Sequence, residues 1–439
     1  MKKNNYQEVY QAFLQANGVS TDTRKIDQGC IFFALRGENF DANTFAAEAL
    51  NKGAAFVVID REEFFLNEKT LLVEDVLDCL QQVSRIHREN FIQPVIGLTG
   101  SNGKTTTKEL IRTVLSQKYK VLATEGNLNN HIGVPLTLLK LKKEHEIAVI
   151  EMGANHQKEI EFLSSLSQPN YGLITSIGKA HLEGFGGFEG VIKAKSELYQ
   201  FIGQENGQLV INGDDELLLG LSGALNKTSY GTKNKADLLA LDCEWQPWVG
   251  FSYQWKEEKR TKKFFTHLTG RYNLDNALSA VCFGKIFGVE DEKIIEALEK
   301  YSPDNNRSQW ISKARHNILM DAYNANPSSM MAALENFVSL DNTEKTVFLG
   351  DMFELGTASA KEHENIVLWL SSQKNVRCYF CGPHFMNCRQ HGNRHSHFFE
   401  SAESCIQTVH PSDLPSGKVL IKGSRGMKME KCLALFENP

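Results

Sequence analysis

The 439-residue sequence has no hydrophobic run long enough to cross a membrane: runs such as AAFVVI fall well short of the ~20 residues that a spanning helix needs. The opening residues, MKKNNYQEVY, lack the apolar stretch of a secretory signal. The sequence also lacks an excess of basic charge. Its 48 lysines and arginines are mixed with 53 acids, giving a net charge of −5, which argues against nucleic acid or an anionic membrane as the main partner. We therefore expect a cytoplasmic globular protein.

Cysteine is present only in nine scattered positions, an odd number that indicates reduced thiols and not a disulfide framework. One group, CYFCGPHFMNC, superficially resembles a zinc site through Cys378, Cys381, His384 and Cys388. The stretch NVRCYFCG reads as a strand, in which residues three apart point to opposite faces. Cys378 and Cys381 would then be unable to bind one ion, so we expect a buried strand and a polar loop instead.

The length is sufficient for two to three domains, and the pattern divides into three regions without internal repeats or heptads. Strand-like and helix-like stretches alternate throughout, as they do in α/β proteins with parallel sheets. We predict a small N-terminal α/β domain over residues 1–90, a central P-loop-type parallel-sheet domain over 91–312 and a C-terminal Rossmann-like α/β domain over 313–439. Expected strands include VIGLTG, EIAVIEMG and YGLITSIG in the centre and HNILMDAY, KTVFLGD, VRCYFCG and KVLIKGS in the last region.

The stretch GLTGSNGKTTTKELI, Gly97 to Ile111, predicts a strand, a glycine-rich turn and a helix N-terminus. Such a turn presents backbone N–H groups and the positive end of the helix dipole to an anion. Lys104 can contact the β and γ phosphates of a nucleotide, and the Thr105 hydroxyl can bind Mg²⁺. Leu98 stands where the usual spacing has glycine, and the alternative is a tight turn with a surface lysine. The predicted phosphate-binding residues are Gly100, Ser101, Asn102, Gly103, Lys104, Thr105 and Thr106.

Two further polar residues follow neighbouring strands. Glu151 ends IAVIE, and His181 follows LITSI in the loop GKAHLEG. Ligands of open parallel sheets gather at the carboxyl ends of the strands, so both residues should lie on the same rim as the phosphate turn. A carboxylate and an imidazole there suit a Mg²⁺ or Mn²⁺ site. Taken singly, Glu151 could be a helix-capping acid and His181 an ordinary loop histidine.

These motifs together resemble the Mur ligases, ATP-dependent enzymes that join an amino acid or dipeptide to a nucleotide-linked cell-wall precursor. The resemblance rests on TGSNGKTTT, EMGANH, GKAHLEGFG and KAKSELY, and extends over nearly the whole chain. GNLNNHIGVP, DAYNANPSSM, LGDMFELG and KGSRGMKME are similar to the members that add D-alanyl-D-alanine to a UDP-N-acetylmuramoyl-tripeptide. The resemblance implies ATP and Mg²⁺, with two ions expected, as cofactors, an acyl phosphate intermediate, a role in peptidoglycan synthesis and a monomer.

The resemblance also implies roles for individual residues. Lys104 would hold the ATP phosphates, Thr105 and Glu151 one magnesium ion, and His181 a second. Lys195, in GVIKAKSELYQF, matches a lysine that several Mur ligases carbamylate and use for the second ion; otherwise it is an exposed helix lysine or pairs unmodified with phosphate. Asn276 would contact adenine, Arg307 the γ-phosphate and Asp321 the ribose. Without the resemblance, Asn276 could be an amide on a helix surface, Arg307 a charge in a linker and Asp321 a cap at the end of a strand.

The resemblance also implies which residues bind the UDP-linked and peptide substrates. STDTRKIDQGC resembles the uridine-diphosphate segment, with Thr21, Thr23 and Arg24 as contacts, although an ordinary polar turn is the alternative. Asn129 and Asn130 in GNLNN, and Asn324, Asn326 and Ser328 in NANPSS, would face the peptide substrates. Asn326 and Pro327 also fit the cap and the first position of a helix. Asp351 and Glu354 in GDMFELG would lie near ATP and the incoming dipeptide. Lys422, Ser424 and Arg425 could meet a carboxylate or be solvated.

Two other functions compete with this one. A ligase of the same superfamily could add a single amino acid, as the third-residue enzyme of the pathway or a folylpolyglutamate synthase does, but NANP and GNLNNHIGVP argue against it. A P-loop protein could instead use ATP hydrolysis as a switch, which would explain neither the uridine-like segment nor Lys195.

Overall fold

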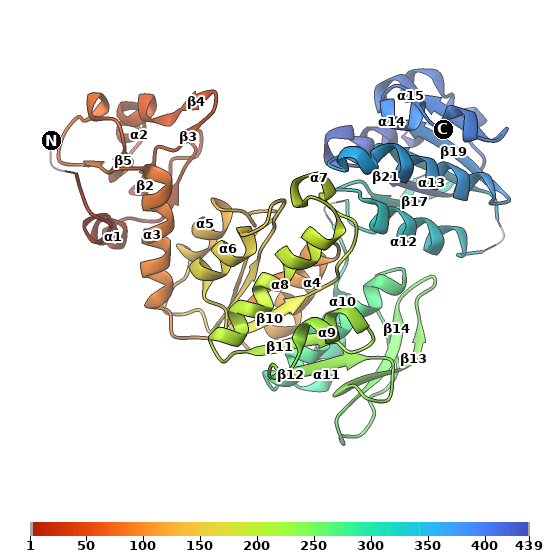
Figure 1. Ribbon diagram of the computed structural model, residues 1–439, viewed down its shortest axis with the longest axis horizontal. Coiled ribbons are helices and arrows are strands. Elements are labelled where there is room, and N and C mark those ends of the chain that lie inside the picture. Colours follow the sequence, from red (N-terminus) through yellow and green to blue (C-terminus); the bar gives the residue numbers. More distant parts are fainter. Residues whose placement is uncertain (1–2, 305, 314, 342, 438–439) are drawn as a thin grey trace.

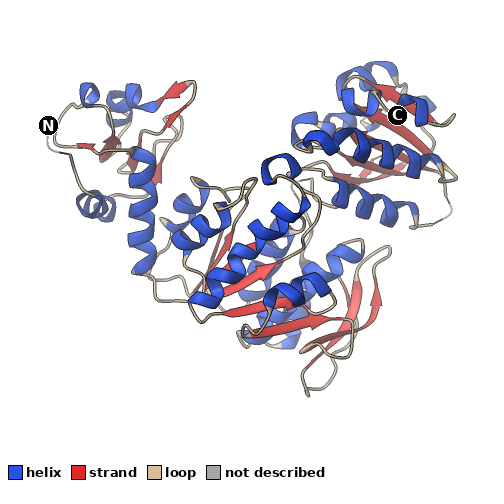
Figure 2. Cartoon of the chain, in the orientation of Figure 1, coloured by secondary structure: helices blue, strands red, loops and turns tan. Residues whose placement is uncertain are grey.

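The computed structural model describes residues 3–304, 306–313, 315–341 and 343–437. Three lobes follow one another along the chain, with the N-terminal and C-terminal lobes on opposite sides of a central one (Figure 1). Each lobe has its own sheet, and helices pack against the sheets (Figure 2). The predicted fold class, three α/β domains with a parallel-sheet centre, is confirmed. Among the residues described, no helix combines the length and apolarity that a bilayer span requires.

The N-terminal domain is built on a parallel sheet in the order β1-β2-β5-β6, with a separate short hairpin, β3-β4. Its strands are β1 (Val19–Ser20), β2 (Ile31–Phe33), β3 (Arg36–Gly37), β4 (Phe40–Asp41), β5 (Phe56–Ile59) and β6 (Thr70–Leu72). Its α-helices are α1 (Tyr6–Gln15), α2 (Ala46–Asn51) and α3 (Val76–Glu89). The strands β2 and β5 are apolar and almost fully buried because helices cover both of their faces.

The central domain has a nine-stranded sheet in the order β15-β14-β13-β12-β11-β10-β7-β9-β8. Only the pairs β13-β14 and β14-β15 are antiparallel. Its strands are β7 (Val95–Thr99), β8 (Val121–Ala123), β9 (Ile147–Glu151), β10 (Tyr171–Ile174), β11 (Gln208–Asn212), β12 (Lys227–Gly231), β13 (Leu238–Glu244), β14 (Gly250–Trp255) and β15 (Phe264–Phe265). Its helices are α4 (Lys104–Leu115), α5 (Gly133–Leu138), α6 (Glu159–Ser167), α7 (Leu182–Phe185), α8 (Phe188–Gln204), α9 (Glu216–Ser222), α10 (Arg271–Ile286) and α11 (Asp291–Lys300).

Two apolar cores lie on the two faces of this central sheet. Helices α4, α10 and α11 contribute to one core, and α5, α6 and α8 to the other. β7, β9 and β10 are neighbours in the sheet, so their carboxyl ends bring the phosphate turn, Glu151 and the loop that carries His181 to one rim.

The C-terminal domain has a six-stranded sheet in the order β16-β17-β21-β18-β19-β20, parallel except for the edge pair β16-β17. Its strands are β16 (Gln309–Lys313), β17 (His316–Asp321), β18 (Lys345–Gly350), β19 (Val376–Cys381), β20 (Ser396–Phe399) and β21 (Gly417–Lys422). Its α-helices are α12 (Pro327–Val338), α13 (Ser359–Ser371), α14 (Pro383–Met386) and α15 (Ala402–Thr408), followed by a 3-10 helix, η7 (Met429–Phe436).

The strand predicted for the cysteine-rich stretch is confirmed, but the expected polar loop after it is instead the short helix α14. The strand is β19, and Cys378 and Cys381 belong to different cores on opposite faces of the sheet. Within the described ranges, no group of three or more histidine, cysteine or acidic side chains is arranged to hold a metal ion. Both cysteines are free and buried, as expected for core thiols.

Candidate active site

A cavity of about 760 Å³ lies where the central and C-terminal domains meet. Residues from the phosphate turn, from the ends of β9 and β17, and from the loops after β8, β10, β18 and β21 line it. The predicted site residues in its wall are Ser101, Asn102, Gly103, Lys104, Thr105, Thr106, Asn129, Asn130, Glu151, His181, Asn276, Arg307, Asp321, Asn324, Asn326, Ser328, Glu354, Lys422, Ser424 and Arg425. Most of the residues predicted from separate motifs therefore share one cavity.

The phosphate turn connects β7 to α4, as the sequence predicts. Gly100 and Gly103 have φ angles of 149° and 82°, a region that favours glycine. A Cβ atom on Gly103 would also lie only 2.6 Å from Oδ1 of Asn276, so the turn and α10 need this glycine to approach each other. The helix begins at Lys104, and its free N–H groups face the turn. The turn has the features of an anion site at a helix N-terminus.

Lys104 is held inside the turn, where its Nζ donates to the carbonyl oxygen of Gly100 over 2.6 Å. Burial lowers the pKa of Lys104, although the charge of Glu151 opposes this shift and that of Arg307 adds to it. An anion placed against the turn would stabilise the ammonium form of Lys104, which burial otherwise disfavours by removing water.

Glu151 lies at the end of β9 with 1% of its surface exposed. Its Oε1 accepts hydrogen bonds from Oγ1 of Thr105 over 3.1 Å and from Nδ2 of Asn129 over 2.7 Å. Its Oε2 is buried and accepts no hydrogen bond from the residues described. A buried carboxylate oxygen without a donor, next to a threonine hydroxyl, fits a hard divalent cation such as Mg²⁺. Glu151 caps no helix, since α6 begins after Lys158.

His181 and Lys195 are near the same cavity but have different surroundings. His181 lies in the left-handed region at φ 51°, just before α7, and its Nδ1 pairs with Glu354 of the C-terminal domain. Lys195 does not line the cavity and is 1% exposed. Its Nζ is 3.5 Å from the carbonyl oxygen of Ala154 and 5.2 Å from the centre of the Phe185 ring. The exposed-lysine interpretation of Lys195 is therefore wrong.

Burial lowers the pKa of Lys195 to about 7, and the charge of Lys104 adds to the effect. None of the ion pairs found in the described residues joins Lys195 to a carboxylate. A lysine in this state is partly a neutral amine near neutral pH, which is the form that reacts with CO₂.

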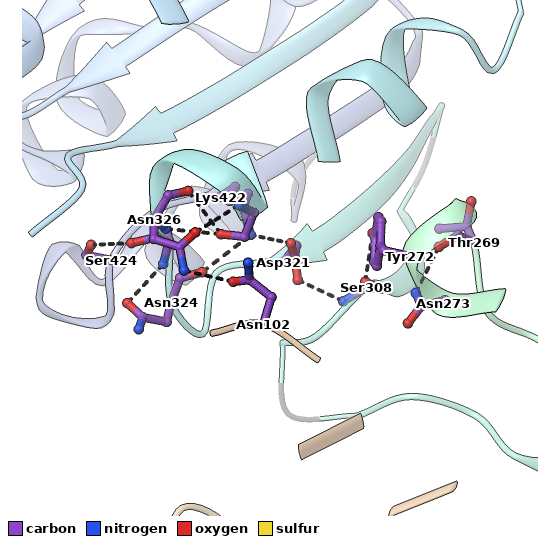
Figure 3. A network of polar contacts seen from close by, with 12 residues as sticks. Asn102, Thr269, Tyr272, Asn273, Ser308, Asp321, Asn324, Asn326, Lys422 and Ser424 are labelled. Carbon is purple, nitrogen blue, oxygen red and sulfur yellow. Dashed lines mark hydrogen bonds and ion pairs between the residues drawn. The ribbon is translucent and has the colours of Figure 1, made fainter. Parts of the chain in front are cut away.

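Arg307 and Asp321 flank the connection between the two domains. The Arg307 guanidinium lies 3.7 Å from the centre of the Tyr323 ring, a stacked cation–π arrangement. Asp321, at the end of β17, accepts from the backbone N–H of Ser308 over 3.1 Å and also pairs with Nζ of Lys422 (Figure 3). Lys422 is thus a buried partner of Asp321, and the interpretation of Lys422 as a solvated charge is wrong.

Asn276 and Tyr272 lie on α10 beside this connection. Oδ1 of Asn276 accepts from Oγ1 of Thr107 over 3.0 Å, and its Nδ2 donates to Asn273 over 3.0 Å. Asn276 is buried, so it is not a helix-surface amide. The Tyr272 hydroxyl lies 3.2 Å from Oγ of Ser308 (Figure 3). The Tyr272 side chain therefore contacts the domain connection.

The NANP loop, residues 324–327, connects the C-terminal domain to the phosphate turn through a hydrogen bond. Asn326 caps α12 by accepting from the Ser329 N–H over 2.9 Å, with Pro327 at the first helical position, as predicted. Its Nδ2 donates to Oδ1 of Asn102 over 2.8 Å (Figure 3). Ser328 adds a second link, since its Oγ accepts from the backbone N–H of Lys179 over 2.9 Å.

Some predicted residues lie elsewhere. Thr21, Thr23 and Arg24 do not line the cavity, and the Arg24 guanidinium makes hydrogen bonds to both carboxylate oxygens of Asp22 over 2.7–3.2 Å. Asp351 is fully buried and accepts from the backbone N–H groups of residues 384 and 385 at the start of α14, so it supports the fold and does not face the cavity.

Comparisons with known proteins are consistent with this geometry. Residues 98–284 match the Mur ligase middle domain, and residues 306–425 match the Mur ligase, glutamate ligase domain. The chain is 36% identical over 434 residues to the UDP-N-acetylmuramoyl-tripeptide–D-alanyl-D-alanine ligase of Bacillus subtilis, covering 96% of this chain and 94% of that protein. It is similar to the crystal structure of MurF from Acinetobacter baumannii, with a TM-score of 0.86, 32% identity and 99% and 98% of the two chains covered.

A second solved structure is similar over its length. The MurF ligase from Thermotoga maritima in complex with ADP has a TM-score of 0.83 and 27% identity to this chain, with 97% of each chain covered.

Proposed function

The chain belongs to the Mur ligase family, and from this premise we propose that it joins D-alanyl-D-alanine to a UDP-N-acetylmuramoyl-tripeptide at the expense of ATP. The product is the UDP-muramoyl-pentapeptide of peptidoglycan synthesis. The observation that carries the proposal is the single cavity in which the phosphate turn, Glu151 and the NANP loop face one another. Relatives that share nearly the full length bear this ligase's name.

The reaction needs activation because a carboxylate is a poor electrophile. ATP transfers its γ-phosphoryl group to the terminal carboxylate of the tripeptide and gives an acyl phosphate and ADP. The amine of D-alanyl-D-alanine attacks the acyl carbon, the C–O bond to phosphate breaks, and an amide and inorganic phosphate result. The protein contributes positioning and charge rather than covalent chemistry.

Lys104 and Arg307 supply positive charge from two sides of the transferred group. Lys104 extends from the phosphate turn, and Arg307 is held over Tyr323 at the domain connection. Magnesium bound by Thr105 and Glu151, with His181 and Lys195 as candidates for a second ion, would neutralise phosphate oxygens during the transfer. We further propose that Asn276 contacts the adenine and that Asp321 contacts the ribose, since both line the same cavity.

The domains divide this work. We assign the UDP-precursor site to residues 1–90, with Thr21, Thr23 and Arg24 as contacts, the ATP site to 91–312, and the amino-substrate site to 313–439. Asp22 uses only Nε and Nη2 of the exposed Arg24 guanidinium, which leaves further N–H donors for the substrate. The protein acts as a cytoplasmic monomer in this proposal, and light scattering at assay concentrations tests the monomer.

The test is ADP release by the purified protein with the UDP-tripeptide, with and without D-alanyl-D-alanine. A ligase releases ADP in step with pentapeptide only when the dipeptide is present. A P-loop switch hydrolyses ATP without any amine, and a ligase for single amino acids responds to D-alanine, L-lysine or L-glutamate instead. Running the lysine and diaminopimelate tripeptides in parallel identifies the third residue of the precursor.

A further inference from the structure

Lys108 is a buried cation that the mechanism above does not use. It lies one helical turn after Lys104 in α4, and its side chain is 0% exposed. Its Nζ donates to the carbonyl oxygen of Thr124 and lies 3.4 Å from that of Gly126. Lys108 is absent from the cavity wall, so it can influence a substrate only through other residues.

Two carboxylates lie near the same ammonium. Oε1 of Glu109 is 2.9 Å from Nζ of Lys108, and Oε2 of Glu151 is 3.9 Å away. The latter oxygen is the one that accepts no hydrogen bond from any described residue. Burial alone would raise the pKa of Glu109, but Lys108 and Arg112 lower it below its ordinary value. Among the ion pairs of the described residues, Lys108 is therefore the cation that pairs with the buried Glu151 carboxylate.

The carbonyl groups that Lys108 binds belong to a segment leading into the cavity. Thr124 and Gly126 follow β8, and the next residues include Asn127, Asn129 and His131, which line the cavity. This segment also contacts Glu151 directly. Oγ1 of Thr124 accepts from the backbone N–H of Glu151 over 3.0 Å, and Asn129 donates to Oε1 of the same residue.

We propose that Lys108 is a positioning residue of the ligation site, which fixes the segment 124–131 and the Glu151 carboxylate in the arrangement that receives the UDP-linked acyl substrate. One ammonium holds the backbone of the segment at Thr124 and Gly126 and balances the charge of the carboxylate that the segment contacts. The proposal rests on the proposed function for the identity of the substrate, whereas the ordering of the segment does not depend on it.

The test compares Lys108→Met with Lys345→Met. Lys345 is also buried, at 3% exposed, and its Nζ binds the carbonyl oxygens of Asp341 and Thr343. It lies at the start of β18, at the other end of the strand from the cavity loop that contains Glu354. Both variants lose a buried, hydrogen-bonded ammonium, so both should melt at a lower temperature. Only Lys108→Met should change the structure and the activity of the ligation site.

Two measurements test whether Lys108 has this positioning role. Hydrogen exchange of the peptide 124–131 should become faster in Lys108→Met and stay as in the wild type in Lys345→Met. The kcat/KM for the UDP-tripeptide should fall about tenfold or more in Lys108→Met, mainly through KM, because a displaced contact segment costs about this much or more. The KM for ATP should change less.

Unchanged exchange and kinetics in folded Lys108→Met, or equal changes in Lys345→Met, would overturn the positioning role. If Lys108→Met does not fold, Lys108→Gln, which keeps a donor and loses the charge, is judged by the same two criteria. A wild-type protein that makes no pentapeptide would refute the proposed function, and the exchange comparison would still decide whether Lys108 orders the segment.

Discussion

Asn326 of the C-terminal domain donates its side-chain N–H to the side-chain oxygen of Asn102 in the phosphate turn, over 2.8 Å. The two residues are 224 positions apart in sequence. The bond connects the loop expected near the dipeptide to the turn expected to hold the ATP phosphates. We therefore expect a nucleotide bound at the turn to influence the position of the C-terminal domain through this bond.

Replacing Asn102 by alanine should weaken this connection without disturbing the turn. The turn is fixed by backbone groups of Asn102, which bond to the side chains of Thr175 and Ser176. A single hydrogen bond contributes about 0.5–1.5 kcal/mol net, so we expect kcat/KM for D-alanyl-D-alanine to fall roughly 2- to 10-fold. Asn326→Ser, which preserves a helix cap, should have the same effect, and the double variant should lose no more than either single one. Additive losses would show that the two residues act separately.

Lys104→Ala tests the phosphate turn. The Lys104 side chain contributes one hydrogen bond to the turn, so the fold should be retained. Turnover should fall by several orders of magnitude, at least about 10²- to 10³-fold, because a preorganised positive group is lost beside the developing charge. Steady-state ADP release and circular dichroism are the two measurements. Ligation close to the wild-type rate by folded Lys104→Ala would contradict the assignment of the ATP site.

Selectivity tests the amino-substrate site. The NANP loop and the loop with Glu354 both line the cavity, and their motifs are those of the dipeptide-adding members. D-Alanyl-D-alanine should therefore be used far better than D-alanine, L-lysine or L-glutamate, as measured by kcat/KM for each amine. A comparable kcat/KM for any one single amino acid would refute the dipeptide assignment.

Lys195→Ala tests the carbamate. Lys195 is buried and Lys193, two residues away on the same helix, is exposed. We expect Lys195→Ala to be nearly inactive and to regain part of its activity with acetate, which can replace the carbamate oxygens near the metal. Lys193→Ala should be much milder. Activity at the wild-type level in Lys195→Ala would exclude a catalytic role.

The carbamate should also depend on pH in a defined direction. The pKa of Lys195 is lowered to about 7, chiefly by burial. Below this pH the side chain is an ammonium, which does not react with CO₂, and above it the neutral amine predominates. The carbamate signal in ¹³C NMR with labelled bicarbonate should therefore increase as the pH rises through about 7, and it should be missing in Lys195→Ala. A wild-type protein without this signal at pH 8 would show that Lys195 acts unmodified.

The strands and the phosphate turn were predictable because their signals are local. A buried parallel strand is a short apolar run, and the turn requires glycines and Lys-Thr in a fixed order. The separation of Cys378 from Cys381 followed from the two-residue period of a strand. Family motifs identified much of the cavity wall, since several of them lie where a strand ends, whereas Asn276 lies on the helix α10.

Contacts between distant segments were not predictable in this way. Lys108 looks like any helix lysine in the sequence, and only the fold shows that its ammonium lies between Glu151 and the carbonyl groups after β8. Asp351 follows a strand just as Glu151 does, yet it binds the start of α14 and faces the core. Strand-end position alone does not distinguish a site carboxylate from a structural one, because the direction of the side chain depends on the neighbouring elements.

The connection at Ser308 has a mechanical consequence. The Tyr272 hydroxyl and the Asp321 carboxylate hold Ser308 from the two domains that it joins. A domain that rotates about such a fixed point moves its near residues little and its far residues a great deal, as a lever does. Arg307, next to this fixed point, would keep its place over Tyr323 while residues of the C-terminal domain farther from Ser308 move more. A rotation of the C-terminal domain about Ser308 would thus open or close its side of the cavity while Arg307 stays in place.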